Sequence, residues 1–132
     1  MAPARDRWWI IGSAAVALHG ADPDSIDDID IVLGVADAER ILPSLGVAPA
    51  AGGSDGQFRS AIYNRWTKPP HPAEYMAGFE LCEDGRWSPV TFATRVEVRP
   101  GIFVPSRDEL HALLLRFGRP KDLRRAASLR SA

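Results

Sequence analysis

The chain of 132 residues has few of the features that mark secreted or membrane-spanning proteins. Its only cysteine, Cys82, cannot form an internal disulfide, and no hydrophobic run approaches transmembrane length. The first nine residues also lack the apolar core of a signal peptide. We therefore expect a cytoplasmic protein that does not associate with membranes, folded as one domain over residues 1–132.

The chain also lacks a strong excess of either charge. The net charge is −1, with five basic and nine acidic residues in positions 1–66 and eleven basic and eight acidic residues in positions 67–132. This polarity is far below the basic excess of a typical nucleic-acid-binding domain. RNA binding through the arginine-rich C-terminal segment ranks last, because few exposed aromatic residues are evident near it.

The most informative stretch runs from Trp8 to Leu33. Its pattern predicts a short buried strand, a sharp turn at Gly12 and Ser13, an alanine-rich helix, a polar loop and a second strand. The second strand carries Asp28 and Asp30. Because side chains alternate along a strand, these two acids are expected on the same face, roughly 6–7 Å apart.

Two carboxylates at this spacing repel each other unless a cation lies between them. A hard divalent cation such as Mg²⁺ binds one or two carboxylates and leaves positions for phosphate and water. The turn at Gly12 and Ser13 opens a helix, and free N–H groups at a helix N-terminus favour phosphate. A phosphate site followed by a metal-binding acid pair indicates phosphoryl or nucleotidyl transfer.

This arrangement resembles the nucleotidyltransferase superfamily, which shares its fold with the catalytic part of DNA polymerase β. The residues that carry the resemblance are Ile10-Ile11-Gly12-Ser13, a spacer of fourteen residues, and Asp28-Ile29-Asp30. Ala15-Val16-Ala17-Leu18-His19-Gly20 is similar to a motif of the small, abortive-infection-like branch. The resemblance implies an α+β fold, with a mixed β-sheet and helices mainly on one face. It also implies Mg²⁺ or Mn²⁺ as the cofactor and a nucleoside triphosphate as a substrate.

Other motif assignments fit the acid pair less well than this resemblance does. The Asp-x-Asp-x-Val nucleophile motif of haloacid-dehalogenase-type phosphatases should end a buried apolar strand, whereas Asp28 follows a polar segment. A calcium-binding EF-hand loop starting at Asp22 would need glycine where Asp27 stands and glutamate where Leu33 stands. The simplest alternative is a solvated strand edge whose acids face water.

The resemblance implies a third carboxylate on the next strand. Glu80 is the candidate, because it lies between Phe79 and Leu81 on an expected strand, where an unpaired acid would be costly to bury. Glu97, between two valines, is the second choice.

The remaining pattern predicts five more strands and three more helices. The strands cover residues 58–66, 75–82, 86–91, 94–99 and 102–104. The helices begin with a cap at Asp37, with the capping box Ser106–Glu109 and with Pro120. At the start of the last helix, Arg119-Pro120-Lys121-Asp122-Leu123 is similar to a late motif of the abortive-infection-like branch. That similarity implies that Lys121 contacts a triphosphate and that Asp122 orients it.

These observations lead to two hypotheses. In the first, Asp28, Asp30 and Glu80 hold the metal while Gly12, Ser13 and Lys121 bind the triphosphate. The reaction would move a nucleoside monophosphate onto a hydroxyl of a small molecule, RNA or protein, with a protein partner or second subunit contributing to the acceptor site. In the second, the chain is a catalytically inactive scaffold of the same fold that binds a nucleotide or a protein partner.

Overall fold

The centre of the molecule is a four-stranded mixed sheet, as expected. In the computed structural model, which describes residues 1 and 3–131, the strand order is β1-β2-β5-β4. The strands are β1 (Trp9–Ile11), β2 (Ile29–Leu33), β5 (Ala73–Ala77) and β4 (Ile62–Trp66). Strands β2 and β5 run parallel, and the other two pairs are antiparallel.

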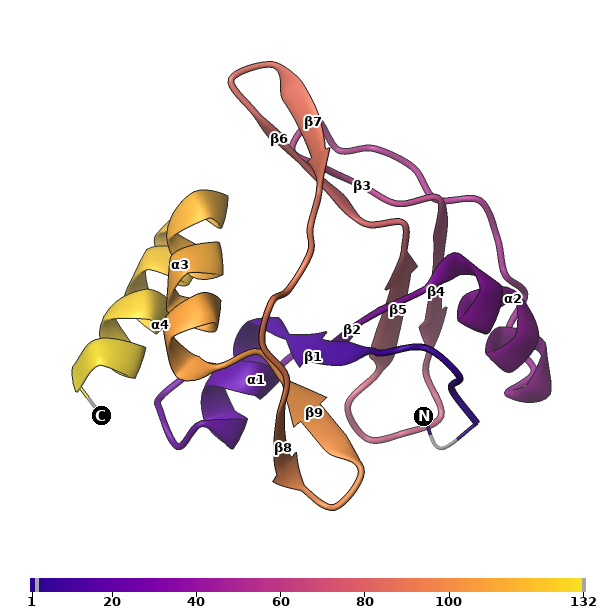
Figure 1. Cartoon of the computed structure of the whole chain (residues 1–132), viewed down its shortest axis with the longest axis horizontal. Coiled ribbons are helices and arrows are strands. Elements are labelled where there is room, and N and C mark those ends of the chain that lie inside the picture. The colour runs from indigo at the N-terminus through magenta and orange to yellow at the C-terminus, as the bar shows by residue number, and fades with distance from the viewer. Residues whose placement is uncertain (2, 132) are drawn as a thin grey trace.

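Two smaller sheets extend from this centre at opposite ends of the molecule (Figure 1). One contains β3 (Phe58–Arg59), β6 (Glu80–Glu83) and β7 (Arg86–Pro89), and the other is the hairpin of β8 (Val96–Arg99) and β9 (Ile102–Val104). The β8–β9 hairpin follows the expected boundaries closely.

Within the described residues, four helices accompany the sheets: α1 (Gly12–Leu18), α2 (Val35–Ser44), α3 (Arg107–Phe117) and α4 (Pro120–Ser131). Helix α3 begins as the capping box predicts, because the Ser106 hydroxyl accepts a hydrogen bond from the Glu109 backbone N–H at 3.2 Å. Gly118 ends α3 in the left-handed conformation, and α4 follows at once, packed beside it (Figure 1). None of the helices in the described part of the chain has the length and hydrophobicity needed to cross a membrane.

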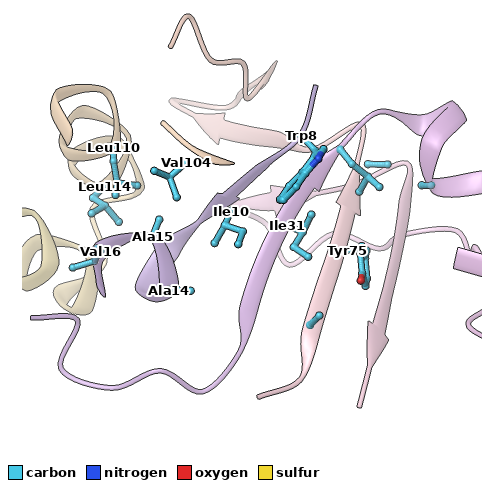
Figure 2. Close-up of a cluster of buried hydrophobic side chains, with 14 of the residues drawn as sticks. Trp8, Ile10, Ala14, Ala15, Val16, Ile31, Tyr75, Val104, Leu110 and Leu114 are labelled. Atoms are coloured by element: carbon cyan, nitrogen blue, oxygen red, sulfur yellow. The ribbon is translucent and has the colours of Figure 1, made fainter. Parts of the chain in front are cut away.

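The two faces of the central sheet have different chemistry. Ile10, Ile31 and Tyr75 point into the main core, where they meet side chains from the helices (Figure 2). Asp30 and Glu74 occupy the intervening positions of β2 and β5, so alternation turns them to the opposite face. The sheet therefore buries one face in the main core, while the other face carries these acids beside a second buried cluster that includes Ile11, Val32 and Met76.

Two of the expected strands are interrupted. The segment 58–66 divides into β3 and β4, and the segment 75–82 divides into β5 and β6. Gly78, with φ of +62°, makes the second break, after which the chain leaves the central sheet and joins another. Alternation of apolar residues continues on both sides of the break, so the sequence pattern resembles one long strand.

Asp37 does not cap α2, contrary to the expectation. The helix begins after Gly34, and the Asp37 carboxylate is buried, accepting hydrogen bonds from the backbone N–H groups of Arg5 (3.1 Å) and Asp6 (2.9 Å) and from Arg40 (2.6 Å). Burial acts to raise the pKa of Asp37, but these hydrogen bonds outweigh it and hold the pKa below its usual value. Asp37 thereby fastens the N-terminal segment to α2.

The break at Gly78 can be tested with alanine. A Cβ at this position would lie 2.8 Å from the Cβ of Ala61, so Gly78→Ala adds a steric clash to the strain of a positive φ. We expect the free energy of unfolding to fall by about 2–5 kcal/mol, as measured by chemical denaturation.

Gly85→Ala is the matched control. Gly85 has φ of +76°, but a Cβ there would meet nothing within 4 Å. Only the backbone strain remains, so a loss of about 1–2 kcal/mol is expected. Equal losses at the two positions would show that the contact with Ala61 does not constrain this break.

Candidate functional site

A cleft of about 540 Å³ lies over the acidic face of the central sheet. Its walls come from the start of α1, the segment 53–60, the end of α3 and the first turns of α4. Five of the six residues expected at the site line this cleft: Gly12, Ser13, Asp28, Asp30 and Lys121. Residues separated by more than a hundred positions in the sequence therefore meet at one cleft.

The register of the sheet aligns four residues in one row. Ile11 on β1 pairs with Asp30 on β2, Asp30 pairs with Glu74 on β5, and Glu74 pairs with Arg65 on β4. Directly paired residues on neighbouring strands have their side chains on the same face. Asp30 and Glu74 are therefore adjacent carboxylates on the floor of the cleft, and Arg65 follows them in the row.

The carboxylate of Asp30 lies in an unfavourable environment for its charged form. Burial, followed by the negative charges of Glu74 and Asp28, raises the pKa of Asp30 to about 7, and Arg119 partly opposes this. The floor of the cleft therefore carries negative charge that the surrounding side chains compensate only in part.

Arg65 and Tyr63 on β4 supply the contacts to the other two acids. Arg65 forms an ion pair with Asp28 at 2.5 Å and lies 3.9 Å from a Glu74 oxygen. The Tyr63 hydroxyl donates a hydrogen bond to Glu74 at 2.9 Å. Burial and the interaction with Glu74 raise the pKa of Tyr63 to about 12, so Tyr63 stays protonated and keeps donating.

Gly12 allows the chain to turn directly above Asp30. It has φ of +66°, and a Cβ at this position would lie 2.7 Å from an Asp30 carboxylate oxygen. No other residue fits without moving the acid. Ser13 follows in the first turn of α1 and is buried at the cleft wall.

Basic residues at the start of α4 form the opposite wall. The buried carboxylate of Asp122 accepts hydrogen bonds from the Arg119 backbone N–H (3.2 Å) and from its guanidinium (2.6 and 3.1 Å). Asp122 thus fixes Arg119, whose charge reaches Asp30 across the cleft. Lys121 is exposed at the same wall and makes no ion pair with any residue that the structure describes.

Helix α4 also fixes the long loop that leads to Asp28. The Arg125 guanidinium donates to the carbonyl oxygens of Pro23 (2.9 Å) and Ser25 (3.3 Å), and Arg124 pairs with Asp24 at 2.7 Å. Arg125 is buried, although arginine seldom is, because these carbonyls satisfy its donors. The fourteen-residue spacer is therefore held in place by the same helix that carries Lys121.

Aromatic rings complete the cleft. Phe58 stacks with Phe79 at a centroid distance of 5.6 Å and meets the edge of Phe117 at 4.8 Å. The Arg119 guanidinium lies over Phe58 at 5.0 Å. The cleft is thus lined by apolar rings as well as by charged side chains.

The structure places Glu80 away from this cleft. Glu80 lies on β6, in a different sheet, and forms an ion pair with Arg59 at 2.8 Å. Glu97, the second choice, lies on the β8–β9 hairpin and accepts a hydrogen bond from the backbone of Gly101. Glu74, which pairs with Asp30 across the sheet, lines the cleft, whereas Glu80 does not. The sequence pattern predicts a strand that begins only at Tyr75 and so leaves Glu74 out, whereas β5 begins at Ala73.

The acids at the floor suit a divalent cation chemically, but they are not arranged as a ready-made metal site. Carboxylate oxygens are the donors that Mg²⁺ prefers, and burial together with the charges of Glu74 and Asp28 raises the pKa of Asp30. In the described part of the chain, however, no three His, Cys, Asp or Glu side chains are grouped closely enough to hold a metal. Asp28 is engaged by Arg65, so this ion pair must open before all three acids can share one cation.

Comparisons with known proteins support one class. No protein-family model matches the chain, and no curated protein resembles it significantly. Among solved structures, the chain is similar to a crystal structure from Thermotoga maritima described as "a putative nucleotidyltransferase (TM1012)". The two share 26% sequence identity with a TM-score of 0.69, over 99% of this chain and 84% of the other. The fold is therefore nucleotidyltransferase-like, and the match supports the superfamily and a general nucleotidyltransferase function.

The raised pKa of Asp30 predicts a pH dependence of stability. An acid whose pKa is higher in the folded state binds its proton more tightly there, so folding is favoured at low pH. In metal-free protein, this stabilisation of the folded state is complete below the unfolded pKa of about 4 and is lost as pH rises to about 7. It amounts to about 1.4 kcal/mol for each tenfold difference in proton affinity between the folded and unfolded states.

Asp30→Asn removes this titration and keeps the size of the side chain. Chemical denaturation of both proteins between pH 4 and pH 8, with chelator present, would measure the difference. We expect the advantage of the variant over the wild type to increase with pH. If the difference in unfolding free energy between the variant and the wild type stays constant from pH 4 to pH 8, the pKa of Asp30 is not raised.

Proposed function

We propose that this chain is a metal-dependent nucleotidyltransferase that moves a nucleoside monophosphate from a nucleoside triphosphate to a hydroxyl acceptor. The observation that carries the proposal is the convergence of Asp28, Asp30 and Glu74 beneath a cleft whose opposite wall is basic. Such a cleft offers separate surfaces for a metal, a polyphosphate and a base. We further propose that the chain is related to the small, abortive-infection-like branch, on the motif that ends at Gly20.

Each wall of the cleft has a role in this proposal. Asp28, Asp30 and Glu74 would hold Mg²⁺ or Mn²⁺, with Glu74 in the role first expected for Glu80. Lys121 and Arg119 would neutralise the charge of the triphosphate, and Gly12 and Ser13 would contact it from α1. The apolar wall around Phe58 would accept the nucleobase.

Bound Mg²⁺ would supply the charge that stabilises the attacking and leaving oxygens of an in-line displacement. The residues of the chain would orient the reactants around it. Asp122 would keep Arg119 facing the cleft, and Arg125 would keep the loop before Asp28 in place. One of the carboxylates would take the proton of the acceptor hydroxyl.

One observation favours the alternative of an inactive scaffold that binds a nucleotide or protein partner. The carboxylate of Asp28 is already paired with Arg65, and the described residues contain no preformed metal cluster. A scaffold would retain nucleotide binding through Lys121, Arg119 and the aromatic wall without needing a cation. The dependence of nucleotide binding on metal therefore separates the two functions.

Calorimetric titration with ATP, GTP, CTP and UTP, with and without Mg²⁺, tests the proposal. For a transferase we expect binding of at least one nucleotide that requires Mg²⁺ and is lost in the Asp28→Asn/Asp30→Asn double variant. Nucleotide binding that is independent of Mg²⁺ would identify a scaffold. No binding of any nucleotide would contradict the transferase for the isolated chain and leave a scaffold that binds a protein partner.

Glu74→Gln and Glu80→Gln form a matched pair that identifies the third acid. Each substitution removes one negative charge from a partly buried glutamate that is paired with an arginine. We expect Glu74→Gln to weaken Mg²⁺-dependent nucleotide binding about tenfold or more, which corresponds to about 1.4 kcal/mol, and Glu80→Gln to leave it unchanged. The reverse result would restore Glu80 to the site.

A further inference from the structure

Arg65 stands out because it is a cation in contact with two of the three acids that the proposed metal would use. It reaches from β4 across β5, bonding Asp28 at 2.5 Å and lying 3.9 Å from Glu74. The register pairs Arg65 directly with Glu74, so the backbone places the Arg65 side chain on the same face as these acids.

The positive charge of Arg65 lies against an Asp28 oxygen that a divalent cation would bind. A carboxylate oxygen that accepts a short hydrogen bond from a guanidinium has less electron density and less room for a metal. The side chains of Arg65 and Asp28 remain 47% and 25% exposed, so water screens the pair and a doubly charged ion can displace it. Arg65 is therefore close enough to Asp28 to hinder metal binding by this acid, and exposed enough for a cation to displace it.

The other arginines near the cleft do not have this relation to the acids. Arg59 pairs with Glu80 and lies over the Trp87 ring, and Arg119 is held by Asp122. Arg125 is bound to backbone carbonyls. Within the described residues, Arg65 is the arginine whose partner is one of the proposed metal ligands.

Building on the proposed function, we propose that Arg65 competes with the divalent cation for Asp28, so that the metal site is complete only when Arg65 is displaced. Arg65 then serves as the counter-ion of the acids in metal-free protein. It also sets the concentration of free Mg²⁺ at which the cleft becomes able to bind a nucleotide. Because Arg65 acts through Asp28, it is a positioning residue.

The test is metal binding itself, measured by calorimetry with Mg²⁺ and Mn²⁺ in the absence of nucleotide. We expect Arg65→Gln to bind each metal about tenfold more tightly than the wild type, because the competing charge is gone. Arg65→Lys keeps the charge on a shorter side chain without the planar fork and should lie between the two. Thermal unfolding in chelator checks that both variants are folded.

Arg116→Gln is the matched control for loss of one positive charge. Arg116 forms an equally short and half-exposed ion pair with Glu83, at 2.6 Å, but it does not line the cleft. We expect its metal affinity to stay within twofold of the wild type. A gain as large as that of Arg65→Gln would show that overall charge, and not competition for Asp28, governs metal binding.

A double-mutant cycle locates the competition at Asp28. In an Asp28→Asn background, Arg65→Gln should change Mn²⁺ affinity by less than twofold, because the contested ligand is absent. A tenfold gain that persists in this background would overturn the proposal and leave the metal site itself intact.

The failure of this inference differs from the failure of the proposed function. If the wild type and Arg65→Gln bind metal equally, the competition is refuted and the metal-dependent function remains. If only Arg65→Gln binds, the competition is supported in its strongest form. If neither protein binds Mg²⁺ or Mn²⁺, the competition is overturned, and the Mg²⁺ dependence of nucleotide binding decides the proposed function separately.

Discussion

The close packing of Asp30 and Glu74 on adjacent central strands is the constraint on which the rest of the site depends. Burial of Asp30, together with repulsion from the neighbouring carboxylate of Glu74, raises the pKa of Asp30 to about 7. Side chains on several neighbouring elements partly offset this repulsion. Tyr63 and Arg65 approach from β4, and Arg119 contributes its charge across the cleft.

The backbone adapts to the same constraint. Gly12 takes a positive φ immediately above Asp30, where a side chain would collide with the carboxylate. On the far side of the cleft, Arg125 binds the carbonyls of the loop that precedes Asp28. Helix α4 therefore serves two purposes, because it brings Lys121 to the cleft and also stabilises the approach to the acids. This explains how a fourteen-residue spacer can lead to a defined position.

Local patterns in the sequence predicted much of the fold correctly. The Gly-Ser turn, the short helix after it, the acid-bearing strand and the capping box before α3 all depend on residues within a few positions of one another. The errors arose where a local pattern was misleading. Gly78 interrupts an apolar alternation that otherwise resembles one strand, and this made Glu80 seem to belong to the central sheet. Asp37 is of a residue type that often caps helices, yet its carboxylate accepts hydrogen bonds from backbone N–H groups that are distant in the sequence.

The sequence by itself indicated the acids Asp28 and Asp30 and the glycine turn before them, although β2 begins at Ile29 and contains only Asp30 of this pair. Only the tertiary structure decided which acid lies beside them and which cation faces them. Glu74 and Arg65 reach the site through strand pairing between segments distant in the chain. Register between distant strands is set by the burial of a whole sheet face and not by neighbouring residues, so no local pattern could reveal it.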